Sequence, residues 1–88
     1  MTELALWLDG NAMAGLLEEA FGAEMTRVRR RCQSCGQRHP IGEHRLYRGA
    51  GEVLRCPNCG DLALRIAVLP DRHVVEVRGT WRLAVPRD

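Results

Sequence analysis

The sequence predicts a small α+β protein that is mainly β, with one N-terminal helix packed on an antiparallel sheet of about five to six short strands. One stretch has helical periodicity, several later stretches alternate apolar and polar residues, and the phrase Cys-x-x-Cys-Gly occurs twice. With 88 residues the chain can bury only a modest core, so a metal or covalent cross-link would add useful stability. We expect residues 1–88 to form a single domain.

The helix is predicted over residues 9–22. Its apolar residues recur at helical spacing and form one stripe: Ala12, Leu16, Leu17, Ala20 and Phe21. Asp9 or Asn11 can cap the first turn by accepting bonds from free backbone N–H groups. Gly22 suits the left-handed residue that ends many helices. The stripe can be buried only against another element, which we expect to be the apolar face of the strands within residues 62–85.

Beyond Gly22 the periodicity changes from helical to alternating, which predicts strands. The strand candidates are residues 25–31, 41–48, 52–56, 61–69 and 73–85. Gly49-Ala50-Gly51 indicates a hairpin between the second and third strands, and Pro70-Asp71-Arg72 indicates a turn before the last. The last stretch alternates most clearly and is expected to extend the sheet as one strand, with a bulge or bend at Gly79 and its end at Pro86.

Four cysteines form the pattern C-x2-C-x20-C-x2-C: Cys32, Cys35, Cys56 and Cys59. Two residues between cysteines allow one tight turn to direct both sulfurs to the same point, and tetrahedral zinc takes four thiolates at about 2.3 Å. Gly36 and Gly60 follow the pairs, at a turn position that tends to need a positive φ. The spacing predicts one metal site with four cysteine ligands. Two redox-active dithiols are the weaker alternative, because no helix is predicted after either pair.

Residues 27–69 resemble the zinc-ribbon class, in which two CPxCG-like turns at the ends of β-hairpins hold one Zn²⁺. The matching stretches are RRCQSCG at 30–36 and LRCPNCG at 54–60, and Gln33 stands where the second stretch has Pro57. The resemblance implies a zinc-ribbon sheet with the four cysteines as ligands and Gly36 and Gly60 as turn glycines. The whole chain, with LDGNAMAGLLEEAFG ahead of the ribbon, also resembles a family of small bacterial proteins of unknown function.

The identity of the metal depends on the surroundings of the cysteines, because tetrahedral Cys₄ sites hold either zinc or iron. Rubredoxins, which are one-iron electron carriers, use similar pairs, and CPNCG fits their pattern. They are usually acidic, with an aromatic core and a tyrosine soon after the first pair, whereas this chain has CGQRHP there. We therefore expect one Zn²⁺ per chain, with a rubredoxin-like electron carrier serving an oxidoreductase as the alternative.

Charge is unevenly distributed along the chain, although its net value is only +2. Residues 1–26 contain five acids and no arginine, whereas residues 27–88 contain all thirteen arginines against six acids, a net charge of +7. The candidate partner-binding residues are Arg27, Arg29, Arg30, Arg31, Arg45, Arg48 and Arg55. They would suit a protein partner or a nucleic acid, as in a transcription-associated zinc ribbon. The alternative is a solvated strand face, because no aromatic residue is interleaved among them to stack on bases.

The sequence favours a non-catalytic binding or accessory module over an enzyme. A tetrathiolate site is closed, whereas a catalytic zinc keeps an open position, and no phosphate-binding glycine loop is present. His39 is expected in a loop, and His44 and His73 are expected to be exposed. Residues 1–10 lack the basic start of a secretory signal, and no stretch approaches the roughly 20 apolar residues of a membrane span. We expect a cytoplasmic protein with an unidentified protein partner, no membrane association and no small-molecule substrate.

Overall fold

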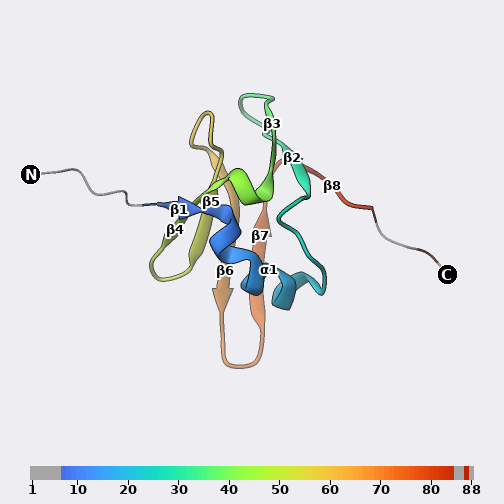
Figure 1. Ribbon diagram of the computed structural model, residues 1–88. Coiled ribbons are helices and arrows are strands. Elements are labelled where there is room, and N and C mark those ends of the chain that lie inside the picture. The colour runs from blue at the N-terminus through green and yellow to red at the C-terminus, as the bar shows by residue number, and fades with distance from the viewer. Residues whose placement is uncertain (1–6, 85–86, 88) are drawn as a thin grey trace, which may run out of the picture.

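The computed structural model describes residues 7–84 and Arg87. In this part of the chain an N-terminal helical segment precedes two antiparallel sheets, of five and three strands (Figure 1). The predicted class, a small and mainly β protein with an N-terminal helix, is therefore confirmed. The strands are divided between two sheets, whereas the sequence predicted one.

The larger sheet has the strand order β1-β4-β5-β6-β7, and all its neighbouring strands are antiparallel. Its strands are β1 (Leu8–Asp9), β4 (Arg45–Arg48), β5 (Glu52–Arg55), β6 (Leu62–Val68) and β7 (His73–Val77). The predicted hairpin joins β4 to β5, and its turn is closed by the N–H of Gly49, which donates to the carbonyl of Gly51 at 3.0 Å. The predicted turn at residues 70–72 separates β6 from β7.

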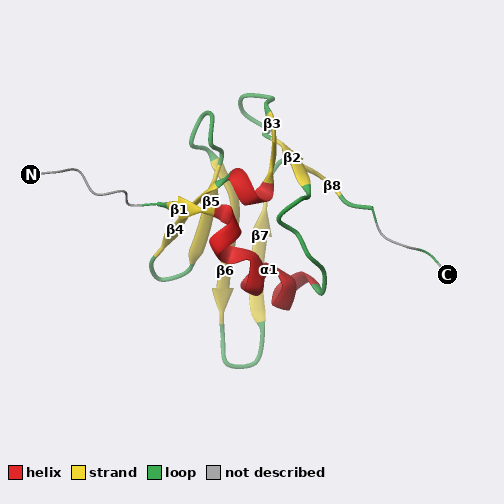
Figure 2. Cartoon of the chain, viewed as in Figure 1, coloured by secondary structure: helices red, strands yellow, loops and turns green. Residues whose placement is uncertain are grey.

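The smaller sheet has the order β3-β2-β8, so its central strand is the one that leads into the first cysteine pair. Its strands are β2 (Arg29–Arg31), β3 (Arg38–Pro40) and β8 (Thr80–Arg82). A short helical turn, η2 (Ile41–Glu43), connects β3 to β4 of the larger sheet. The two cysteine-containing loops therefore project from different sheets (Figure 2).

The N-terminal helix consists of a 3-10 turn, η1 (Gly10–Met13), followed by α1 (Ala14–Phe21). Asp9 caps its start as predicted, because its carboxylate accepts from the N–H of Asn11 at 2.9 Å. The helix ends as predicted at Gly22, whose N–H donates to the carbonyl of Glu18 at 2.7 Å. No helix in residues 7–84 is long and apolar enough to cross a membrane.

The hydrophobic core lies between the helical segment and the larger sheet. The helix contributes Met13 and Leu17, and Leu64 and Ile66 of β6 are likewise almost fully buried. The remaining buried members of the cluster are Met25, Ile41, Leu46, Leu54 and Ala63. The core is aliphatic, as the small number of aromatic residues predicts. The predicted stripe is buried only in part: Leu17 is in the core and Leu16 and Ala20 pack against it, whereas Ala12 and Phe21 are exposed.

The stretch predicted as one strand over residues 73–85 forms two strands in different sheets. β7 ends at Val77, and β8 begins at Thr80 and pairs with β2. Between them Gly79 has a φ of 85°, a conformation that side chains with a Cβ rarely adopt. The predicted bulge or bend is thus a complete change of sheet. Val85 and Pro86, expected at the end of the strand, lie outside the described residues.

Candidate metal centre

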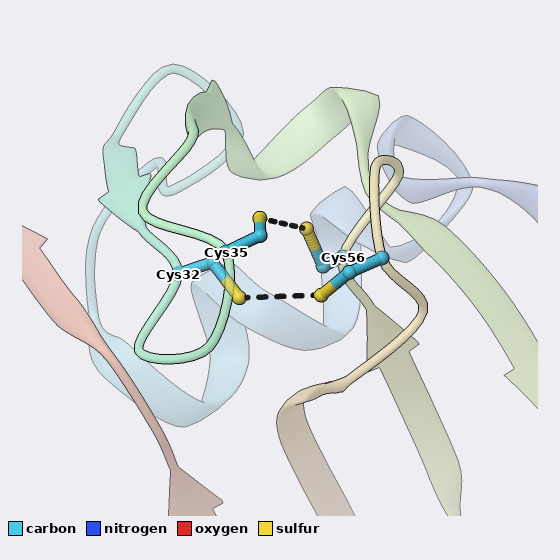
Figure 3. Close-up of side chains that lie close together, drawn as sticks. Cys32, Cys35 and Cys56 are labelled. Carbon is cyan, nitrogen blue, oxygen red and sulfur yellow. Dashed lines mark hydrogen bonds between the residues drawn. The ribbon is translucent and has the colours of Figure 1, made fainter.

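Four cysteine thiols converge from two loops, one between β2 and β3 and the other between β5 and β6. Their Sγ atoms all lie within 4.8 Å of one another. The closest pairs join different loops, with Cys32 and Cys59 at 3.6 Å and Cys35 and Cys56 at 3.7 Å (Figure 3). Sulfurs bound to one tetrahedral zinc at about 2.3 Å are about 3.8 Å apart. The cluster therefore has the spacing of a four-thiolate metal site and is too open for disulfides, which need about 2.05 Å.

The two loops have the same backbone hydrogen bonds, which explains the repeated sequence phrase. In the first loop the N–H of Cys32 donates to the carbonyl of Gln37 at 2.9 Å, and the N–H of Gly36 donates to the carbonyl of Cys32 at 3.0 Å. The second loop repeats both bonds at the equivalent positions, each at 2.9 Å. Gly36 and Gly60 have φ values of 78° and 81°. The predicted need for positive φ at both glycines is confirmed.

Backbone N–H groups also point at the sulfurs. The N–H of Ser34 lies 3.4 Å from the Sγ of Cys32, and the N–H of Asn58 lies 3.4 Å from the Sγ of Cys56. Burial opposes ionisation of Cys32, but the backbone N–H groups and neighbouring thiols outweigh it and lower its pKa to about 6. These donors stabilise thiolate, the form of cysteine that binds metals.

The fourth thiol favours its protonated form while no cation lies among the sulfurs. The backbone N–H near Asp61 favours ionisation of Cys59, but desolvation and the other three thiols raise the pKa of Cys59 to about 12. Four thiolates at this spacing repel one another unless a positive charge lies between them. A bound divalent metal ion would supply that charge and displace the remaining protons.

The cluster is buried on one side and open on the other. Cys32 and Cys56 are almost completely buried, Cys35 is half-buried, and Cys59 is exposed. Each loop therefore contributes its first cysteine from the protein interior and its second from nearer the surface. The exposed edge at Cys59 is the point where solvent can reach the site.

A hydrogen-bonded bridge links the two loops beside the cysteines. Asp61, which follows the second pair, accepts from the side-chain amide of Gln33 at 2.7 Å and from the hydroxyl of Ser34. The Ser34 bond, followed by the backbone N–H of Leu62, lowers the pKa of Asp61 despite some desolvation. Gln33 occupies the position of Pro57 in the second loop, and the bridge gives the reason: a proline there could not reach across to Asp61.

A buried arginine lies next to this bridge, two residues before Cys32, and it corrects the sequence-based interpretation. Arg30, predicted to face a partner, is only 1% exposed. Its guanidinium donates to the carbonyl of Arg78 at 2.8 Å, to Gln33 Oε1 at 2.7 Å and to the carbonyl of Leu62 at 3.3 Å. It belongs to the structural support of the metal centre and is inaccessible to a partner.

His44, predicted to be exposed, is also buried, at 1% exposure. Burial is the main reason that its pKa falls to about 4; the charge of Arg30 adds to the effect, and the bond to the carbonyl of Pro40 partly opposes it. His44 is therefore neutral near pH 7. His73 is half-buried and lies 3.0 Å from a carboxylate oxygen of Glu19.

The other predicted arginines do not form one continuous surface. Arg48 pairs with Glu52 at 3.4 Å. Arg45 lies opposite Arg55 on neighbouring strands of the larger sheet. Arg27 lines a shallow hollow that also contains acidic side chains.

Arg29 also borders that hollow. Together with Arg31 it lies on the smaller sheet, in a groove that Arg38 and Arg82 also line. The sequence-based set omitted these last two residues. Arg82 could not be assigned to the groove without knowing that β8 pairs with β2.

The fold and the site together define a class of protein: a small, mainly β chain with a Cys₄ cluster suited to a metal ion. More particularly, the chain belongs to DUF6510, a family of unknown function whose model matches residues 2–88. No curated protein and no solved structure matches it. The expected relationship to a family of unknown function is confirmed, and the family contributes no activity that could be transferred to this chain.

Proposed function

We propose that this protein is a non-catalytic zinc-ribbon module that holds one structural Zn²⁺ and presents arginines to a protein or nucleic acid partner. The observation that carries the proposal is the four-sulfur cluster at the ends of two loops with matching hydrogen bonds. Four thiolates fill every position of tetrahedral zinc, which leaves none for a substrate. In this module the metal stabilises the fold, and binding occurs on the surface around it.

The surroundings of the cluster support zinc in a structural role. Arg30 is buried, and no carboxylate of the described residues contacts it directly; buried charges require compensation. A zinc tetrathiolate carries a net charge of −2, so it would provide an anionic centre close to this guanidinium. Four reduced cysteines also suit the reducing cytoplasm, which is where we expect the protein to act.

Elemental analysis of the purified chain tests the proposal. The protein should be expressed aerobically with both zinc and iron in the medium and purified without a polyhistidine tag, which would itself bind metal. We expect one zinc per chain and a colourless protein. A red protein with one iron per chain would identify the rubredoxin-like electron carrier instead. The final dialysis buffer, analysed in parallel, gives the background metal content.

A further inference from the structure

One face of the smaller sheet carries a band of four exposed arginines. Residues directly opposite each other on antiparallel strands share a face, and Arg29 lies opposite Arg82 while Arg31 lies opposite Arg38. Because β2 is the central strand, the band runs diagonally from β8 across β2 to β3. The Cα atoms of neighbouring members are about 5–7 Å apart, whether measured along a strand or across to the next one. We call these four residues the arginine band.

The arginine band has no acidic partner in the described part of the chain. Four other arginines each pair with a carboxylate: Arg48, Arg65, Arg72 and Arg78. The members of the band form no such pair within residues 7–84, and only Arg29 also borders a hollow that Glu24 and Glu43 line. Like charges directly opposite each other destabilise a sheet, so the band weakens the fold that contains it. Such a local conflict is typical of functional sites.

The band lines a groove rather than a flat surface. The groove has a volume of about 400 Å³ and is completed by Thr80 and Trp81 of β8. One face of the Trp81 ring is covered by Phe21, whose centroid lies 6.1 Å away in a stacked arrangement, and its Nε1 donates to the carbonyl of Arg78 at 2.9 Å. The tryptophan is therefore engaged within the protein. The groove therefore offers guanidinium groups and a hydroxyl beside the apolar surface of Trp81.

We propose that the arginine band binds the phosphate backbone of a nucleic acid. This inference rests on the proposed function, because the band lies on the sheet that leads into the metal centre. Guanidinium groups form paired, charge-assisted hydrogen bonds with phosphate oxygens. A nucleic acid presents a regular row of phosphates that can meet several guanidinium groups at once, whereas the centre of a typical protein interface is depleted of charged residues. Contacts to phosphates carry no sequence information, so binding through the band is independent of sequence.

Salt dependence tests this chemistry directly. A fluorescein-labelled 20-base-pair duplex of arbitrary sequence is titrated with the zinc-loaded chain between 50 and 200 mM salt. Neutralising four phosphates predicts a slope of about −3.6 in a plot of log affinity against log salt. Affinity should therefore fall about 100-fold over this range. A wild-type chain that shows no binding at 50 mM salt overturns the proposal.

A matched pair of double variants distinguishes the effect of the arginine band on binding from the effect of net charge. Arg31→Ala/Arg38→Ala removes two members of the band, whereas Arg65→Ala/Arg72→Ala removes two exposed arginines elsewhere. Both lower the net charge by the same amount. We expect the first to reduce the slope to about −1.8 without lowering the melting temperature, and the second to retain most of the wild-type slope. Equal losses in both variants would show that only overall charge matters and would overturn the assignment.

Two further probes separate nucleic acid from other anions. Polyglutamate represents an acidic protein, and a nucleoside triphosphate represents a small phosphate ligand. Tighter binding of either than of the duplex, at the same salt concentration, would overturn the nucleic acid assignment. The zinc content of each sample keeps the two proposals distinguishable. A zinc-containing, folded chain that fails to bind contradicts only the arginine-band inference, whereas a chain without zinc contradicts the proposed function.

Discussion

The guanidinium of Arg30 lies against the imidazole of His44, with Nη1 3.2 Å from Nε2, and both side chains are buried. The other ring nitrogen, Nδ1, lies 2.9 Å from the carbonyl oxygen of Pro40. A carbonyl only accepts hydrogen bonds, so Nδ1 carries the proton and Nε2 accepts from the arginine. The pair is stable only while the histidine is neutral, because a protonated ring would lose this bond and place a second positive charge beside the first.

The free energy of unfolding should therefore decrease as the pH falls below the pKa of an ordinary histidine. The pKa of His44 is about 4 in the folded protein and about 6.5 when exposed. Between these values the unfolded chain binds a proton that the folded chain excludes, so the free energy of unfolding decreases as the pH falls. We expect a loss of about 2 kcal/mol between pH 7 and pH 5, measured by urea unfolding at each pH.

His44→Gln is the control, because it removes the titrating ring and retains an acceptor for Arg30. Its metal ligands are unchanged, so any acid-induced loss of metal affects it as it affects the wild type. The variant should have a shallower dependence on pH in this window, although it is less stable at pH 7. Parallel pH profiles for the two proteins would contradict a neutral, buried His44.

Arg30→Lys should destabilise the protein although it preserves the charge. The guanidinium donates from three nitrogens in a fixed plane, and a single ammonium on a flexible chain cannot reach the same acceptors. Leaving buried acceptors unpaired costs about 1–3 kcal/mol each, so we expect a loss of about 2–4 kcal/mol in urea unfolding. Arg29→Lys, at the exposed neighbouring position, should stay within about 0.5 kcal/mol of the wild type. Similar losses of stability in the two variants would indicate that Arg30 lies at the surface.

Gly79→Ala tests the change of sheet between β7 and β8. A Cβ at this position would lie 2.5 Å from the carbonyl oxygen of Arg31 and 3.0 Å from Nε of Arg30, in addition to the strain of a positive φ. We expect a loss of more than about 2 kcal/mol. Gly49→Ala, whose Cβ would meet nothing within 4 Å, should stay within about 1 kcal/mol of the wild type. A Gly79→Ala protein as stable as the Gly49→Ala protein would contradict the passage of the chain from one sheet to the other at Gly79.

The two ends of the cysteine cluster should respond differently to the loss of a ligand. Cys56→Ser places a hydroxyl at a fully buried position, and we expect an unfolded or aggregated protein because metal binding contributes to folding. Cys59 is exposed, so in the Cys59→Ser variant a water molecule can serve as the fourth ligand. That variant should fold but bind zinc more than about 10-fold more weakly, as measured by competition with a chromophoric chelator. Equal behaviour of the two variants would contradict the asymmetric burial of the cluster.

The form of each cysteine loop was predictable because its determinants are local. Each pair, its following glycine and its turn lie within a few residues, so the spacing alone predicts two equivalent loops. The start and end of the helix were predictable for the same reason, since Asp9 and Gly22 act on backbone groups within four residues of themselves.

The role of Arg30 was missed because its partners lie far away in the sequence, although one local signal was present. Consecutive residues of a strand point to opposite faces, so three adjacent arginines cannot all face solvent when one face of the sheet is covered. The odd member, Arg30, had to point inward. Its bond to the carbonyl of Arg78 spans 48 residues, and no periodicity within either segment predicts such a contact.

The pairing of β8 with β2 has a consequence during synthesis of the chain. Arg29 pairs with Arg82, so the strand that leads into the first cysteines is synthesised roughly fifty residues before its partner β8. Both cysteine pairs are translated before β8, and a metal ion can therefore join them while the smaller sheet still lacks its third strand. Metal capture would then come first and closure of that sheet last, so the nascent chain would hold its metal before the sheet beside it is complete.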